Sequence, residues 1–173
     1  MNPYKKAITE EMNKLAKVKN SIFIGQQVGV TDFYGTLAKV PKNKRIEMPV
    51  AEEMQLGMSI GLALEGCLPI SIFQRMDFLP RACDQIVNHL GKIKNLSQGL
   101  YNPKVIIRTT IGSRTPIDCG LQHCQDLTEG FRKMVNFPVL KVSTPKEVRE
   151  AYRLAMENDG PIMIVELAEL YKE

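Results

Sequence analysis

Short, uninterrupted apolar runs alternate with helical patterns along this chain, and that alternation restricts its fold more than any other feature. The runs lack the polar residue at every second position that a half-solvated strand would carry. The candidate strands are residues 21–25, 68–73, 104–108, 139–142 and 162–165. Helical patterns separate or flank them at residues 3–18, 49–65, 77–96, 125–136 and 145–158. Buried strands that alternate with helices predict a three-layer α/β/α fold with a mostly parallel sheet.

The length and composition predict an ordinary globular protein. A chain of 173 residues fits a single domain over residues 1–173. No apolar run approaches the length of a membrane span, and the N-terminus lacks the apolar core and cleavage site of a signal peptide. We therefore expect a cytoplasmic protein. The net charge of +4 is modest, and the basic cluster at 42–45 has no interleaved aromatic residues, so nucleic-acid binding is not expected.

The cysteines do not predict a metal centre. None of the four forms a Cys-x-x-Cys pair. Cys119, His123 and Cys124 lie close together, but the second ligand pair of a zinc site is absent from the sequence. We expect reduced thiols and no metal ligands in this chain.

The helical pattern that Pro49 opens is apolar almost all round, which predicts a buried helix. Glu52 and Glu53 fall in its first turn, where the helix dipole favours acidic side chains. Gly57 and Gly61 share one face and allow close approach of another backbone. Residues 26–46, before this helix, are expected to form a polar loop.

Several common catalytic motifs are absent. The sequence has no Gly-x-x-x-x-Gly-Lys-Ser/Thr loop, no Gly-x-Gly-x-x-Gly and no Gly-x-Ser-x-Gly elbow. A self-contained nucleotide-binding enzyme or a serine hydrolase is therefore not expected.

One long stretch, Glu47-Met-Pro-Val-Ala-Glu52-Glu-Met-Gln-Leu-Gly57-x-x-x-Gly61, resembles a known family. It is similar to the segment that carries the catalytic glutamate in beta subunits of the pyruvate dehydrogenase type, the pyrimidine-binding chains of thiamine-diphosphate enzymes. The similarity continues in order along nearly the whole chain. It includes Phe73, Asp77-Phe78, Asp84-Gln-Ile-Val-Asn88, Pro103-x-Val-Ile-Ile-Arg108, Gln122-His123-x-Gln125, Val142-x-x-Pro145 and Pro161-x-x-x-x-Glu166-x-x-x-Leu170-Tyr171.

The resemblance implies a catalytic role for Glu52. In this family a carboxyl group hydrogen-bonds a pyrimidine ring nitrogen of thiamine diphosphate and so favours the tautomer that removes the thiazolium proton. An apolar surrounding would raise the carboxyl pKa and help it share a proton. The residues alone explain Glu52 equally well as a first-turn acid, and that explanation is kept for Glu53.

Four further residues match family positions. The resemblance implies that Phe78 packs on the cofactor's pyrimidine ring, although its place in a helical stripe also fits a core residue. Val50 and Gln74 match positions that line the same pocket. His123 matches a histidine at the substrate end of the site, where it would donate a proton or orient the substrate.

The segment before His123 departs from the family. In the family it is rich in glycine, whereas here Thr110–Gly120 is bulkier and contains Arg114. One hypothesis is that Arg114 binds an anionic part of an unusual substrate, because a guanidinium matches carboxylate and phosphate geometry. The alternative is a solvent-facing loop arginine.

The resemblance also implies a partner. This sequence lacks the family's Gly-Asp-Gly signature for the diphosphate, so Mg²⁺ and the diphosphate would be held by an alpha-type subunit, with α2β2 as the expected assembly. Family beta subunits have a further C-terminal domain that this sequence does not contain, which favours a small-molecule acceptor over a lipoyl arm. We expect a thiamine-diphosphate-dependent lyase, transferase or 2-oxo acid decarboxylase that cleaves a 2-oxo acid or ketose. The alternatives are a shortened lipoyl-linked dehydrogenase subunit and a non-catalytic regulatory paralogue.

Overall fold

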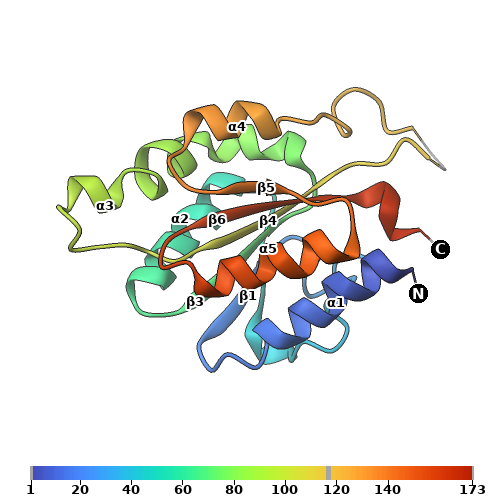
Figure 1. Ribbon diagram of the computed structural model, residues 1–173, viewed down its shortest axis with the longest axis horizontal. Coiled ribbons are helices and arrows are strands. Elements are labelled where there is room, and N and C mark those ends of the chain that lie inside the picture. Colours follow the sequence, from blue (N-terminus) through green and yellow to red (C-terminus); the bar gives the residue numbers. More distant parts are fainter. Residues whose placement is uncertain (1, 116–117, 173) are drawn as a thin grey trace.

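Six parallel strands form the centre of the molecule (Figure 1). The computed structural model describes residues 2–115 and 118–172. Within them the strands are β1 (Ser21–Gly25), β2 (Arg45–Glu47), β3 (Leu68–Phe73), β4 (Ile106–Ile111), β5 (Val139–Lys141) and β6 (Ile162–Leu167). Their order across the sheet is β2-β1-β3-β4-β6-β5, and every neighbouring pair is parallel. The predicted parallel sheet is confirmed.

Helices cover both faces of this sheet, as the alternation predicts. On one face α1 (Pro3–Leu15) and α5 (Pro145–Glu157) pack side by side, with the short helix η4 (Ala168–Tyr171) near α1. The other face is covered by α2 (Glu52–Leu64), α4 (Thr128–Met134) and the helical segments between β3 and β4. Two separate apolar cores result, one on each side of the sheet.

The local sequence signals explain where the two long helices of the first face begin. Thr144 caps α5 by accepting a hydrogen bond from the Glu147 N–H, and the Glu147 carboxylate accepts one from the Thr144 N–H, so the two residues form a capping box. Asn2 caps α1 in a similar way, and Pro3 follows in the first turn. The apolar stripe of each helix then faces the sheet.

The expectation of a polar loop at 26–46 is wrong in two respects. Residues 45–47 form β2, an edge strand that pairs with β1 from Phe23 to Gly25. The β1–β2 loop, defined here as residues 26–41, also contributes four side chains to the first core: Val28, Phe33, Leu37 and Val40. Phe33, Leu37 and Val40 have helical spacing, but Val28 does not continue it and residues 32–39 fold as turns, so this short pattern predicted no buried element.

The single long helix expected at 77–96 is also wrong. The segment divides into the 3-10 helix η2 (Met76–Ala82), the π-helix η3 (Gln85–Leu90) and the short α-helix α3 (Ile93–Leu96). Pro80 lies inside η2, where it lacks an N–H and cannot continue an α-helical ladder. Ala82, Ile86 and Leu90 of the predicted stripe are nevertheless buried in the second core.

Helix α2 is not buried all round. Leu56 and Ile60 lie in the second core, whereas Met54 and Met58 are 47% and 39% exposed. Gly57 and Gly61 are exposed as well, and a Cβ atom built on either would contact no neighbouring atom. One side of this apolar helix therefore faces solvent in the isolated chain.

A fully buried ion pair joins two central strands. Arg108 on β4 and Glu166 on β6 are each 0% exposed, with Arg108 Nη2 2.9 Å and Nε 3.0 Å from the Glu166 carboxylate oxygens. Tyr152 on α5 donates a hydrogen bond to Glu166, and so does Tyr171 on η4. Burial opposes the charge on Arg108, but the Glu166 carboxylate outweighs it and raises the pKa of the guanidinium.

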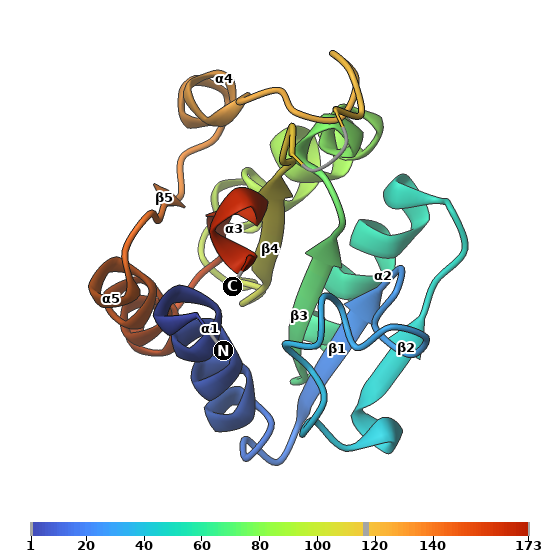
Figure 2. The same ribbon diagram turned by 90° about the vertical axis from the view of Figure 1, so that its right-hand side faces the viewer.

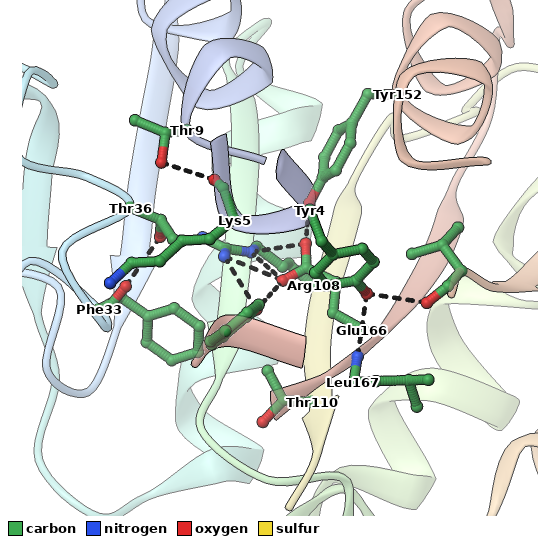
Figure 3. Close-up of polar contacts among 12 residues, drawn as sticks. Tyr4, Lys5, Thr9, Phe33, Thr36, Arg108, Thr110, Tyr152, Glu166 and Leu167 are labelled. Atoms are coloured by element: carbon green, nitrogen blue, oxygen red, sulfur yellow. Dashed lines mark hydrogen bonds and ion pairs between the residues drawn. The ribbon is translucent and has the colours of Figure 1, made fainter. Parts of the chain in front are cut away.

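The same arginine fixes the β1–β2 loop (Figure 3). Arg108 donates from Nη1 to Thr36 Oγ1 at 3.0 Å, and its guanidinium lies 4.7 Å from the centre of the Phe33 ring. Gln27, Asp32, Phe33 and Tyr34 in this loop all have positive φ, which costs side-chain-bearing residues about 1 kcal/mol or more each. The contacts with Arg108 offset that strain and hold the loop in one conformation.

The structure contains no helix long and apolar enough to cross a membrane, within residues 2–115 and 118–172.

We predict that Glu166→Gln destabilises the chain by about 3–5 kcal/mol, because it leaves the Arg108 charge buried without a counter-ion. Urea denaturation followed by circular dichroism measures this loss. Glu150→Gln is the matched control, since Glu150 pairs with Arg153 on the exposed side of α5 and should change the midpoint little.

The double variant Arg108→Met/Glu166→Gln removes both charges and should recover part of the loss. Equal midpoints for Glu166→Gln and the wild type would show that leaving Arg108 buried without its counter-ion does not destabilise the fold.

Candidate functional site

The carboxyl ends of the central strands meet at one edge of the sheet. Beyond β1 the chain turns toward β2, whereas beyond β3 it turns toward β4 on the opposite side. Figure 2 shows β1 and β3 next to each other, with β2 beyond β1 and β4 beyond β3. In parallel sheets such a divergence opens a crevice outside the strand ends, and ligands bind there. Gln26 and Gln27 follow β1 at this place, and Gln74 and Arg75 follow β3.

Glu52 lies beside this crevice, in the first turn of α2. Its side chain is 2% exposed, although it is ionisable and begins a helix. Gln26 Nε2 donates to Glu52 Oε1 at 3.3 Å. The second oxygen, Oε2, is buried and has no hydrogen-bond partner. A buried carboxyl oxygen without a partner is costly, and it is available to a ligand that brings a donor.

Arg81 on η2 is the nearest cation to this carboxyl group. Its Nε atom lies 3.1 Å from Glu52 Oε2, but the orientation does not satisfy a hydrogen bond. The Arg81 side chain is 69% exposed, so solvent screens the attraction and the side chain is free to move. We regard the contact as a loose ion pair that leaves the Oε2 lone pairs open.

A cavity of about 540 Å³ adjoins Glu52. Val50, Gly57 and Met58 line it together with Arg81 and Gln85. Val50 is 72% exposed, so it lies at the open side of the cavity. The structure thus brings together two of the residues that the sequence predicted for the cofactor pocket, Val50 and Glu52.

Phe78 and His123 form a second group. Their rings meet edge to face, with centroids 5.7 Å apart, and both side chains are half-buried. His123 Nδ1 lies 3.1 Å from the Cys119 carbonyl oxygen. A carbonyl accepts only, so Nδ1 carries the proton in this contact and Nε2 is left to accept or, when protonated, to donate.

Asp77 anchors the segment around His123. Its Oδ1 atom accepts from the backbone N–H of Gln125 at 3.1 Å and from Gln125 Nε2 at 3.0 Å. Gly112 packs closely against the same segment, because a Cβ atom there would lie 1.9 Å from the His123 carbonyl oxygen. These contacts hold the His123 segment against the end of β4.

The other two predicted residues lie elsewhere. Gln74 does not line the cavity beside Glu52; it lines a smaller one together with Gln27 and Arg75. Arg114 Nη1 lies 3.2 Å from Asp118 Oδ2, and both side chains are about half exposed. Residues 116–117, in the same loop as Arg114, lie outside the described residues. Arg114 is thus engaged with a neighbour four residues away.

Gln26 and Arg81 also contact Glu52, and neither was among the predicted site residues. Gln26 could have been identified, since a polar residue directly after a buried strand falls at the carboxyl edge of the sheet. Arg81 could not have been identified from its position in the sequence, because its approach to Glu52 depends on how η2 packs against α2. No group of three or more potential metal ligands occurs within 2–115 and 118–172, and none of the four cysteines forms a disulfide.

Comparison with curated proteins finds relatives along almost the whole chain. The pyruvate dehydrogenase E1 component subunit beta of Chlorokybus atmophyticus is 28% identical over 173 residues, which cover 96% of this chain and 50% of that protein. The protein of the same name from Gracilaria tenuistipitata var. liui is 30% identical, with 95% and 52% covered. The chain spans about half the length of the curated relatives it matches.

Solved structures share the fold. A transketolase from Campylobacter jejuni superposes with a TM-score of 0.76 at 20% identity, over 94% of this chain and 25% of that one. A chain described as a split-gene transketolase in an inactive beta4 tetramer gives a TM-score of 0.68 at 20% identity, over 94% and 48%. The family model "Transketolase, pyrimidine binding domain" matches residues 2–173. Since that match spans almost the whole chain, this protein belongs to the family of transketolase pyrimidine-binding domains.

Proposed function

We propose that this chain is the pyrimidine-binding, beta-type subunit of a split thiamine-diphosphate enzyme. The observation that carries the proposal is Glu52, a carboxyl group that is 2% exposed, adjoins a cavity and has one oxygen without a hydrogen-bond partner. Membership of the family indicates the kind of ligand, thiamine diphosphate. The buried Glu52 carboxyl group is suited to bind the pyrimidine ring of that ligand.

The residues around Glu52 fit a pyrimidine ring. Oε2 would meet a ring nitrogen, Gln26 steadies the other oxygen, and Val50 and Met58 offer apolar surface. Thiamine diphosphate, when bound, supplies the carbanion chemistry that allows a bond next to a carbonyl to break. Glu52 would hold or share a proton at Oε2 with the ring nitrogen that it meets.

His123 is proposed to act at the substrate. Its Nδ1 is directed to the Cys119 carbonyl, which leaves Nε2 to exchange a proton with a substrate oxygen or to orient it. Phe78 contacts the His123 ring and limits its rotation. We therefore propose Phe78 as a residue that positions His123, in addition to the cofactor contact predicted from the sequence.

The partner is proposed to cover the exposed side of α2. Met54, Met58 and Leu64 are 47%, 39% and 43% exposed, and Gly57 and Gly61 leave open space beside them. An apolar helical surface with two glycines suits close packing against another helix. We propose an alpha-type subunit there, in an α2β2 assembly, with the diphosphate and Mg²⁺ on the alpha-type chain.

The reaction proposed is cleavage of a 2-oxo acid or ketose next to its carbonyl group, followed by transfer of the acyl or ketol unit to a small molecule. The second candidate is a lipoyl-linked 2-oxo acid dehydrogenase, which the names of the curated relatives favour. Transfer to free lipoamide by the purified complex would select the second candidate, and transfer to an aldehyde or aldose would select the first.

We predict that Glu52→Gln lowers turnover of the complex by about 10²–10⁴-fold, the usual contribution of a proton-transferring group. The complex is purified from the native cell through a tag on this chain. Its bound thiamine diphosphate and its cleavage of 2-oxo acids and ketoses are then measured. Glu53→Gln is the matched control, because Glu53 is adjacent but exposed and hydrogen-bonded to Gln85.

Equal activities of the Glu52→Gln and Glu53→Gln complexes would refute the role of Glu52. A complex that binds no cofactor would instead support the regulatory alternative.

We further predict that Gly57→Leu abolishes assembly with the partner while the chain stays folded. The leucine side chain would fill the space that a second helix needs, and its Cβ atom meets no neighbouring atom within the chain. Gly130→Leu on α4 is the matched control, since its Cβ also meets open space. Light scattering after size exclusion measures assembly, and complete complexes from the Gly57→Leu chain would place the partner elsewhere.

A further inference from the structure

A second, smaller cavity lies at the crevice between β1 and β3. Its volume is about 250 Å³, less than half that of the cavity beside Glu52. Gln27, Thr31, Phe33, Tyr34, Gln74 and Arg75 line it. Three of them follow directly on the two strands whose connections diverge, where the sheet topology favours ligand binding.

Arg75 is an arginine without a partner. Every other arginine of the described chain is paired: Arg45, Arg81, Arg108, Arg114, Arg132, Arg149 and Arg153 each form an ion pair. The side chain of Arg75, in contrast, has neither a hydrogen bond nor an ion pair with any residue the structure describes, although the residue is half-buried. A partly desolvated guanidinium without a counter-charge is unfavourable unless an anion supplies one.

The other polar groups of this cavity can also donate hydrogen bonds. Gln27 uses its Oε1 to accept from Thr31 at 2.8 Å, which directs its amide NH₂ group away from that bond. No Asp or Glu lines the cavity. The nearby Glu47 carboxylate is occupied by the backbone N–H groups of Gln27 and Gly29, at 2.6 Å each. The lining therefore combines one positive charge with the amide N–H donors of two glutamines, which suits an oxyanion.

The cavity also lies near the proposed substrate end of the site. Arg75 and His123 both approach Gly112, since a Cβ atom there would lie 2.5 Å from Arg75 Nη1 and 1.9 Å from the His123 carbonyl oxygen. A substrate that reacts near His123 could thus extend a charged end toward Arg75. The exposed Arg114 is already paired with Asp118, so Arg75 fits this purpose better.

We propose that Arg75, Gln27 and Gln74 form a subsite for the oxyanionic end of the substrate, either a phosphate ester or a carboxylate. A guanidinium presents two parallel N–H donors that match either group. The small volume suits such a head group and excludes the cofactor. This inference rests on the proposed function for the identity of the substrate, but anion binding itself requires neither cofactor nor partner.

The test is titration of the full chain with inorganic phosphate and, separately, with pyruvate, followed by NMR of the backbone amides of Gly112 and Gln27. Saturable shifts are expected in the wild type. Arg75→Gln should weaken binding about tenfold or more, because it removes a charge-assisted pair of hydrogen bonds. Arg75→Lys should give an intermediate loss, since it keeps the charge but loses the planar fork.

Arg114→Gln is the matched control, since it removes the same charge from the same edge of the sheet and should bind as the wild type does. Saturation by phosphate alone assigns a phosphate ester, and saturation by pyruvate assigns a carboxylate. No saturable binding of either probe, or equal weakening by Arg75→Gln and Arg114→Gln, would overturn the subsite.

Thermal unfolding of each variant is measured first. An unpaired cation does not stabilise the fold, so loss of folding in both Arg75 variants would contradict the proposal. Cofactor-dependent turnover that persists without anion binding would refute the subsite alone. Anion binding in a chain that never binds thiamine diphosphate would refute the proposed function alone.

Discussion

The buried pair of Arg108 and Glu166 is the interaction on which the geometry of the functional edge depends. It connects β4 to β6, receives hydrogen bonds from α5 and η4, and reaches across to the β1–β2 loop. A buried ion pair contributes little net stability, since desolvation of both charges offsets their attraction. Its importance here lies in positioning: it holds Phe33 and Thr36, and through them a loop with four non-glycine residues at positive φ.

That loop shapes the ligand-binding edge. Phe33 faces the Arg108 guanidinium and also lines the small cavity, so the core and the proposed anion subsite share a side chain. Glu52 is positioned differently, by the start of α2, and its hydrogen bond from Gln26 links it to the end of β1. The two cavities therefore depend on the same strand end, one through Gln26 and the other through Gln27. The proposed cofactor contact at Glu52 and the proposed anion subsite are therefore neighbours along this edge.

The sequence predicted the layers well and the irregular segments poorly. Buried strands such as β1 and β3 were predicted with their observed bounds, because continuous apolar runs and flanking breakers mark them. The segment 77–96 was predicted as one helix, because its apolar spacing outweighed Pro80 in that interpretation. Strand β2 was missed, since three residues at a sheet edge carry no periodic signal. Of the predicted site residues, Val50 with Glu52 and Phe78 with His123 are brought together, whereas Gln74 lines the smaller cavity and Arg114 pairs with Asp118.

By itself, the sequence determined the fold class, the family and the candidate glutamate and histidine, because these follow from local patterns and from motifs in a fixed order. Only the tertiary structure decided which polar groups are paired. Pairing depends on distances between segments that are remote in the chain, as between Arg108 and Glu166 or between Arg81 and Glu52. For the same reason Arg75 and Arg114 look alike in the sequence, and only folding leaves Arg75 half-buried and without a partner.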